Sequence, residues 1–259
     1  MGGVALDIKG LSIGYTGKSG STVVADGIDA TLFKGELVAL IGRNGAGKST
    51  LLRTLAAYQK PLGGRVEYEG ADASALSIKE LSRKISVVLT DAMAMANMSV
   101  QELVALGRTP YTNFWGSLTA DDREIVTRAM DIMGITPFAL RRISMLSDGE
   151  RQKCLIAKAI AQQTAVILLD EPTAFLDYRS KVHLMHALRN IARDENKAVI
   201  VSTHDIELAL RLADKLWLVS DGRLVAGTVD ALSSDGSLQA FIDDECIAYN
   251  TEEKRIEIK

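Results

Sequence analysis

A glycine-rich loop is the first part of this sequence whose residue types could do chemistry. Residues 42–50 fit the pattern G-x4-G-K-[ST]. Its glycines let successive backbone N–H groups curl around phosphate oxygens, and a helix start adds partial positive charge. Lys48 would bring a point charge to the β- and γ-phosphates of a nucleotide, and Ser49 would ligate Mg²⁺. The predicted nucleotide-binding residues of this phosphate loop are Gly42, Arg43, Asn44, Gly45, Ala46, Gly47, Lys48, Ser49 and Thr50.

Two adjacent acids form the second candidate group. Asp170 and Glu171 directly follow the apolar run 166–169, so both would emerge at the carboxyl end of a strand. Asp170 would hold Mg²⁺ through its water shell, and Glu171 would orient or deprotonate the water that attacks the γ-phosphate. An acidic pair at a strand end is common surface chemistry by itself. The pair becomes specific only together with the phosphate loop.

Alternating strands and helices must position these groups. The apolar run 37–41 predicts a strand before the phosphate loop, and the leucine spacing in 48–57 predicts a helix after it. Strand and helix patterns alternate again over 166–219, which favours parallel strands. Between them, 100–106, 121–133 and 148–161 read as helices, so we expect a helical insert in an α/β domain.

Composition narrows the class of protein. The chain has 259 residues, 47% of them hydrophobic, and a net charge of -3, which predicts a globular core and gives no general attraction to nucleic acid. Cys154 and Cys246 are isolated, which argues against a disulfide framework or a zinc site. Apolar runs are far shorter than the roughly 20 residues of a membrane helix, and the first residues lack a secretory pattern. We therefore expect a cytoplasmic chain.

The segment Leu146-Ser147-Asp148-Gly149-Glu150-Arg151-Gln152 resembles the LSGGQ signature of ATP-binding-cassette (ABC) ATPases. In the same order as in that family, Tyr15 looks like the adenine-stacking aromatic residue, residues 174–177 like the D-loop, and His204 like the switch histidine. The resemblance implies a P-loop NTPase core with an antiparallel β subdomain and an α-helical signature subdomain. We expect one ABC domain over 1–259, with a catalytic core of about 1–90 and 164–259 and a helical subdomain of about 91–163.

The same resemblance implies partners. ATP and Mg²⁺ would bind between two copies of the chain in a head-to-tail dimer, in which Ser147, Gly149 and Glu150 of one copy face the γ-phosphate held by the other. Glu171 and His204 would be the catalytic residues. Integral membrane permease subunits would bind the dimer at the cytoplasmic face of the inner membrane, and an external substrate-binding protein would deliver cargo to them.

Three positions depart from the family pattern. Thr90 stands where the family usually has a glutamine that contacts Mg²⁺, so Thr90 is a candidate metal ligand, and a bridging water or Asp91 is the alternative group that would stand in for the amide. Asp148 replaces a signature glycine, and Glu150 replaces the glutamine. An acid near ATP would repel the γ-phosphate, so we expect Asp148 to point away from it.

The segment 98–111 is similar to the importers of iron-siderophore, haem and cobalamin, which makes such an importer ATPase the leading hypothesis. The alternatives are an exporter or other transporter ATPase, a non-transport ABC protein, and a phosphate-loop kinase. Phe114 and Trp115 would either contact the permease or be buried. His183, His186 and the charged run 252–255 are expected to be exposed and without a function.

Overall fold

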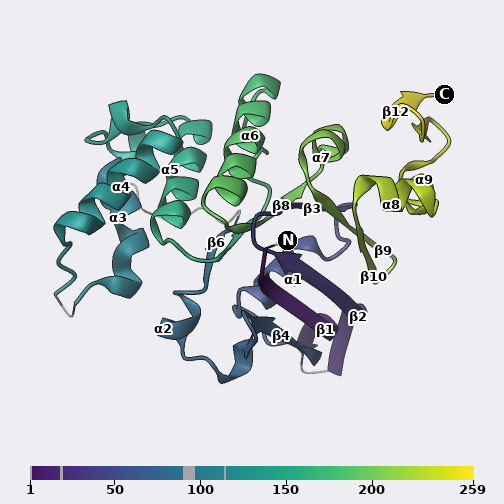
Figure 1. The fold of residues 1–259 in the computed structure, drawn as a ribbon, viewed down its shortest axis with the longest axis horizontal. Helices are drawn as coiled ribbons and strands as arrows, with labels where there is room; N and C mark the ends of the chain where they lie inside the picture. The colour runs from purple at the N-terminus through teal and green to yellow at the C-terminus, as the bar shows by residue number, and fades with distance from the viewer. Residues whose placement is uncertain (1, 18–19, 90–96, 114) are drawn as a thin grey trace.

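The computed structural model describes residues 2–17, 20–89, 97–113 and 115–259 (Figure 1). The strands are β1 (Val4–Gly17), β2 (Gly20–Phe33), β3 (Leu37–Gly42), β4 (Gly63–Tyr68), β5 (Ala71–Asp72), β6 (Ile85–Val88), β7 (Val166–Leu169), β8 (Ala198–Thr203), β9 (Lys215–Ser220), β10 (Arg223–Gly227), β11 (Ile247–Asn250) and β12 (Arg255–Ile258). The α-helices are α1 (Lys48–Leu55), α2 (Ile78–Leu81), α3 (Val100–Ala105), α4 (Ala120–Ile132), α5 (Asp148–Ala161), α6 (Tyr178–Asp194), α7 (Ile206–Leu212), α8 (Val229–Ser234) and α9 (Ser237–Ile242). Short 3₁₀ turns include η2 (Leu106–Tyr111) and η3 (Thr136–Phe138).

A parallel sheet forms the centre of the molecule. Its strand order is β10-β9-β3-β8-β7-β6, and β9, β3, β8, β7 and β6 run parallel to one another. Every residue of β3, β7 and β8 is buried, as expected for strands that are covered on both faces. The predicted parallel strands are therefore confirmed, and β10 adds an antiparallel edge.

A second, antiparallel sheet with the order β2-β1-β4-β5 covers α1 and one side of the central sheet. β1 is much longer than the sequence pattern predicts, because its alternation continues past Gly10 through irregular pairings with β2. Leu6, Ile8 and Leu11 point from β1 into a core shared with α1 and with Trp217 of β9. This sheet is the antiparallel subdomain that the family resemblance implies.

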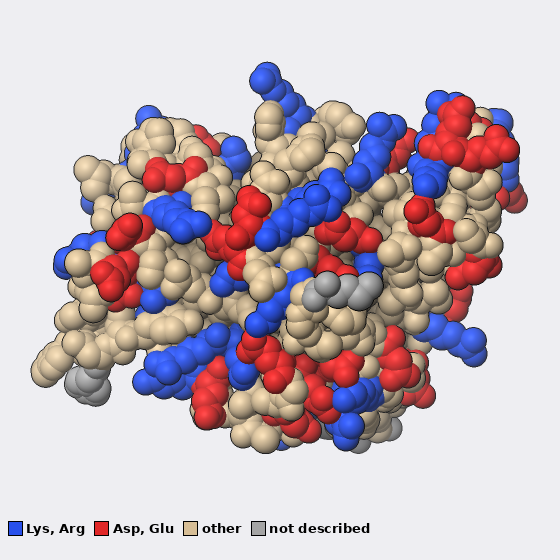
Figure 2. Space-filling view, in the orientation of Figure 1, with Lys and Arg blue, Asp and Glu red and all other residues tan. Residues whose placement is uncertain are grey.

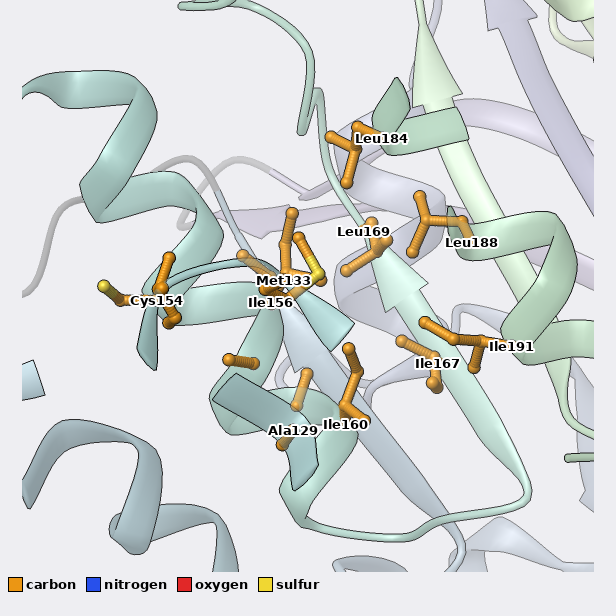
Figure 3. Packing of buried hydrophobic residues seen from close by; sticks show 14 of the residues in the cluster. Ala129, Met133, Cys154, Ile156, Ile160, Ile167, Leu169, Leu184, Leu188 and Ile191 are labelled. Atoms are coloured by element: carbon orange, nitrogen blue, oxygen red, sulfur yellow. The ribbon is translucent and has the colours of Figure 1, made fainter. Parts of the chain in front are cut away.

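Helices α3, α4 and α5 form a lobe on one side of the sheet (Figure 1). Figure 3 shows how the lobe meets the core: Ala129 and Met133 from the α4 side and Ile156 and Ile160 of α5 face Ile167 and Leu169 of β7, with the buried face of α6 beyond them. These buried side chains belong to one continuous cluster. The lobe is thus joined to the sheet through apolar packing.

A buried ion pair ties the lobe together internally. The Arg108 Nε donates to Asp122 Oδ1 at 2.8 Å, and its Nη1 donates to the Ala161 carbonyl at 2.9 Å. The guanidinium also lies over the ring of Tyr111, 4.2 Å from the ring centre. Hydrogen bonds from the Thr119 backbone and from Arg108 lower the pKa of Asp122 to about 2. A carboxylate this well satisfied stays charged although it is buried.

The sequence pattern predicts no helix or strand for the C-terminal segment, residues 237–259. It contains α9 and a hairpin of β11 and β12, which pack near α7 in the same apolar cluster as Ile41 of β3. Residues 252–255 are exposed at the turn of this hairpin, as predicted. The segment therefore reaches the end of β3, where the phosphate loop begins.

Basic and acidic side chains are interspersed over the face shown in Figure 2. None of the helices in the described part of the chain has the length and apolarity that a membrane crossing requires.

Candidate functional site

The phosphate loop connects the end of β3 to the start of α1. Its backbone needs glycine at two positions, because Gly45 has φ of 81° and Gly47 has φ of 104°. A Cβ on Gly47 would also lie 2.6 Å from Cγ1 of Val24. Arg43, Asn44 and Gly45 are exposed, so the outer part of the loop is accessible. The loop therefore has the open, curled backbone that phosphate binding requires.

Lys48 lies inside the curve of this loop. Its side chain is buried, and Nζ donates to the carbonyl of Gly42 at 2.8 Å and to that of Arg43 at 3.4 Å. Burial lowers the pKa of the Lys48 ammonium, and the negative charges of Glu171 and Asp170 oppose that shift. Desolvation and nearby carboxylates thus act on one buried cation, which is common at functional sites.

The first turn of α1 carries the hydroxyl groups of the loop. Ser49 is half-buried, and Thr50 Oγ1 lies 2.7 Å from the hydroxyl of Tyr15. Tyr15 comes from β1 in the antiparallel sheet and is 50% exposed. The structure therefore brings the predicted aromatic residue to the phosphate-loop helix and leaves half of its surface open.

Asp170 and Glu171 follow β7 at the same edge of the sheet, and Ser202 of β8 holds them. The Ser202 hydroxyl donates to Asp170 Oδ1 at 2.7 Å, and the backbone N–H of Glu171 donates to Ser202 Oγ at 2.8 Å. Asp170 and Ser202 are buried. Glu171 has φ of 49°, in the left-handed region that non-glycine residues rarely adopt. The hydroxyl of Ser202 therefore fixes both the buried acid and the turn that follows it.

His204 follows β8 and contacts the second acid. Its Nε2 lies 2.5 Å from Oε1 of Glu171, and both side chains are partly exposed. The carboxyl ends of β3, β7 and β8 thus place Lys48, Asp170, Glu171 and His204 at one edge, as predicted for ligand sites of parallel sheets.

The signature segment begins α5 with a capping box. The backbone N–H and the hydroxyl of Ser147 both donate to Glu150 Oε2 at 2.8 Å, and the Glu150 N–H donates to Ser147 Oγ at 3.3 Å. These hydrogen bonds lower the pKa of Glu150. Asp148 forms an ion pair with Arg151 and is largely exposed. Glu150 in this sequence therefore caps its own helix.

Gly149 links the signature to the D-loop. A Cβ at this position would lie 2.9 Å from Cδ2 of Leu176, so the two segments pack closely. In the part of the chain that the structure describes, no hydrogen bond joins Ser147, Gly149 or Glu150 to the phosphate loop of the same chain. Within one copy, the signature is a separate feature of the lobe.

The family model of the ABC transporter matches residues 25–174, from β2 to the D-loop. The chain belongs to the ABC transporter family. An uncharacterised ABC transporter ATP-binding protein of Methanocaldococcus jannaschii is 42% identical over 85% of this chain and 75% of that protein. The ferric enterobactin transport ATP-binding protein of Escherichia coli is 37% identical over 83% of this chain and 78% of that protein. A cobalamin import ATP-binding protein of Halobacterium salinarum is 39% identical over 93% of this chain, which spans only 59% of that relative.

Solved structures of ABC proteins have the same fold. A metal-chelate type ABC transporter in an inward-facing conformation superposes with a TM-score of 0.78 at 26% identity, over 98% of this chain and 95% of that one. A dimeric bacterial ABC transporter cassette superposes with a TM-score of 0.77 at 25% identity, over 86% of this chain and 98% of that one. The predicted fold class of an ABC ATPase is therefore confirmed.

Several residues singled out in the sequence of this ABC ATP-binding chain do not belong to the site at the carboxyl ends of β3, β7 and β8, or lie outside the residues that the structure describes. Thr90, Asp91 and Phe114 lie outside the described residues. Trp115 is 84% exposed, which decides against burial. His183 and His186 are exposed, as expected.

Ser202 is the residue that sequence reasoning missed. It contacts both acids, yet its only sequence signal is a serine near the end of an apolar strand, two residues before His204. A polar residue in a strand that is otherwise fully buried needs a partner, and that requirement could have pointed to the neighbouring strand end.

Proposed function

We propose that this ABC ATPase powers a membrane importer for an iron-siderophore, haem or cobalamin. The observation that carries the ATPase part is the Glu171–His204 contact at the sheet edge that also holds Asp170 and the lysine of the phosphate loop. The importer part is supported by relatives named for ferric enterobactin, siderophore and cobalamin transport, and by the metal-chelate type transporter among the solved structures.

ATP binding rests on the loop and on Tyr15. The N–H groups of residues 42–50 and the start of α1 surround the phosphates, and Lys48 exchanges its loop carbonyls for the β- and γ-phosphate oxygens. The half-exposed ring of Tyr15 stacks on the adenine. The hydrogen bond of Tyr15 to Thr50 holds that ring beside the helix that carries the phosphates.

The donor set fits Mg²⁺ that arrives with the nucleotide. Ser49 and Asp170 offer hard oxygen ligands, and the described residues gather no group of three or more His, Cys, Asp or Glu side chains that could hold an ion alone. Mg²⁺ in nucleotide sites uses one or two protein oxygens plus phosphates and water. When bound, the ion neutralises charge on the β- and γ-phosphates.

Glu171 and His204 act on the attacking water. The carboxylate of Glu171 accepts a hydrogen bond from that water and takes its proton as the water attacks the γ-phosphate, whose bond to ADP breaks so that ADP and phosphate are released. His204 holds the Glu171 side chain through its Nε2 contact and contacts the γ-phosphate. The Ser202 hydroxyl accepts a hydrogen bond from the Glu171 N–H and so fixes the backbone of that residue. The site therefore positions the base from both its side chain and its backbone.

A second copy of the chain completes the site. The N-terminus of α5, with Ser147 and Gly149, presents a hydroxyl and backbone N–H groups that suit a γ-phosphate. Within the described residues of one copy these groups form no hydrogen bond to the phosphate loop, and two solved neighbours are dimeric cassettes, one of them bound to ADP and phosphate. In the head-to-tail dimer each signature covers the ATP of the other copy. Glu150 supports this arrangement by capping the helix.

Permease subunits bind the helical lobe at the cytoplasmic face of the membrane, and an external binding protein supplies them with cargo. The lobe carries exposed apolar side chains, among them Trp115 and Leu140, which are 84% and 86% exposed. Aromatic side chains such as that of Trp115 are enriched in protein–protein interfaces. Thr90 and the following residues are the proposed link between this contact and the nucleotide.

The test uses the membrane protein that co-purifies with the tagged chain. The complex is reconstituted in proteoliposomes with its binding protein and ATP, and uptake of a ferric siderophore, haem and cobalamin is measured. We expect ATP-dependent uptake of one of them, which Glu171→Gln abolishes. ATP-dependent transport in the opposite direction would instead identify an exporter. A phosphorylated small-molecule product would identify a kinase.

A further inference from the structure

A cavity of about 510 Å³ lies between the antiparallel sheet and the edge of the central sheet. Its walls come from β1 and β2 on one side and from β9 and β10 on the other. Strands β2 and β10 are joined at one point, where the Asp26 N–H donates to the Gly222 carbonyl at 3.0 Å. Further along these strands, Thr31 of β2 and Ala226 of β10 line the cavity. The volume is within the range of about 300–1,000 Å³ that is typical of small-molecule sites.

Trp217 of β9 lines this cavity and carries an unsatisfied hydrogen-bond donor. The side chain is 0% exposed, and its Nε1 has no hydrogen-bond partner among the residues that the structure describes. A buried tryptophan N–H usually has a partner, because an unpaired buried donor costs free energy. Ala226 is paired with Trp217 across β9 and β10, and its small side chain takes up little of the cavity. The indole N–H is therefore available to an acceptor atom of a molecule bound there.

The lysines at the cavity are already paired with carboxylates. Lys215 precedes Trp217 by two residues, so both side chains project from the same face of β9. The Lys215 Nζ lies 2.9 Å from Oε1 of Glu36. The Lys9 Nζ lies 2.8 Å from Oε2 of Glu67. An anionic ligand would therefore have to compete with these glutamates for each cation.

The aspartates that line the cavity are not matched to the same degree. Asp7 accepts a hydrogen bond from the Thr31 hydroxyl at 2.8 Å and forms an ion pair with Lys9 at 3.1 Å. Asp29 accepts from the Gly10 N–H at 2.8 Å through Oδ1, but it forms no ion pair within the described part of the chain. The cavity therefore offers one unused donor, the indole N–H, and one carboxylate without a cation, so it favours a ligand that is not an anion.

We propose that this cavity binds a small neutral carboxamide with an apolar body. The carbonyl oxygen accepts a hydrogen bond from Trp217 Nε1, and the amide N–H donates to the carboxylate of Asp29. Ile8, Ala30 and Phe33 supply apolar surface for the body of the ligand. Size permits the fit, because a cavity of about 150 Å³ already accommodates benzene. A neutral amide matches the donor and the acceptor without bringing a negative charge beside the acids.

The first test observes the indole N–H itself. The chain contains two tryptophans, so Trp115→Phe leaves Trp217 as the only indole signal in a ¹⁵N NMR spectrum. Benzamide is the probe, and we expect a saturable downfield shift of the Trp217 indole proton as its hydrogen bond forms. Benzoate, which has the same ring with a negative carboxylate, should bind at least tenfold more weakly. An indole signal that benzamide does not move, as when an ordered water satisfies the donor, overturns the inference, and so does tighter binding of benzoate.

The second test measures benzamide binding to variants of the full chain by calorimetry. Trp217→Phe removes the donor and should raise the dissociation constant about fivefold, the factor that one neutral hydrogen bond contributes. Ala226→Leu enlarges a side chain of the lining and should raise the dissociation constant at least tenfold. Val225→Ala is the matched control, because Val225 is the neighbouring residue of β10, is exposed and does not line the cavity.

Thermal unfolding establishes that each variant is folded before binding is compared. Native affinity for benzamide in Ala226→Leu, or an equal loss in Val225→Ala, overturns the inference. No residue of the phosphate loop lines this cavity, so either result leaves the proposed function intact.

Discussion

Ser202→Ala removes one hydroxyl that serves both acids of the site. In the native chain this buried hydroxyl donates to Asp170 Oδ1 and accepts from the Glu171 N–H. Alanine fits the same space without strain, so the change deletes hydrogen bonds and little else. The backbone of Glu171, at φ of 49°, then loses the contact that holds it.

The magnitude follows from the two hydrogen bonds. A hydrogen bond to a charged group contributes about 1.5–3 kcal/mol and a neutral one about 1 kcal/mol, so the free energy of unfolding should fall by about 2.5–4 kcal/mol. Without the Ser202 hydroxyl, the Glu171 carboxylate should also shift by up to about 1 Å, and misplacement of a catalytic base on this scale lowers kcat about 10- to 100-fold. The KM for ATP should change little, because Lys48 and the loop N–H groups are unaffected.

The assay combines urea unfolding with steady-state phosphate release. Ser86→Ala is the matched control, since Ser86 is an equally buried serine of β6 whose Oγ accepts from Thr164. It should lose about 1 kcal/mol of stability and keep full ATPase activity. The reasoning is refuted if Ser202→Ala keeps kcat within twofold of wild type, or if the Ser86→Ala control loses as much activity.

Three further predictions concern the helical lobe. Arg108→Ala leaves the buried carboxylate of Asp122 unpaired and should cost about 3–5 kcal/mol in urea unfolding, whereas a loss under about 1 kcal/mol would contradict the ion pair. The pKa of Asp122 is about 2 in the folded chain, against 3.8 for the unperturbed group, so the unfolded chain binds the proton first as pH falls. The contribution of Asp122 to the free energy of unfolding is present above about pH 4 and is lost toward pH 2. The fall in stability over this pH range should therefore be smaller in Asp122→Asn. Glu150→Ala should lose about 1 kcal/mol by opening the capping box, and Glu150→Gln, which still accepts from Ser147, should lose less; equal losses would exclude that role.

The sequence predicts the central sheet closely because its strands are buried on both faces. The apolar runs 37–41, 166–169 and 198–201 form most of β3, β7 and β8, and each is followed directly by a residue of the site. The helix that begins at Asp148 is predicted to the residue, because Ser147 and Glu150 form a capping box that local sequence specifies. Local chemistry and buried periodicity therefore suffice for these elements.

The features that the sequence does not predict depend on contacts between segments that are distant in sequence. The hydroxyl of Ser202 reaches Asp170 only because β8 pairs with β7, and no spacing along the chain encodes that contact. The C-terminal hairpin is short and only half-buried, so the alternation of apolar and polar residues along its strands is too weak to predict them. Its position against α7 is decided by tertiary packing.

Glu171→Gln tests the central claim most directly, because it keeps the size and shape of the base and removes its proton-accepting charge. The measurement is ATP binding and phosphate release on the same purified chain with Mg²⁺. The account predicts that ATP binds with near-native affinity while phosphate release falls at least 100-fold. Phosphate release within a few-fold of the wild-type rate would contradict the role of Glu171 as the base.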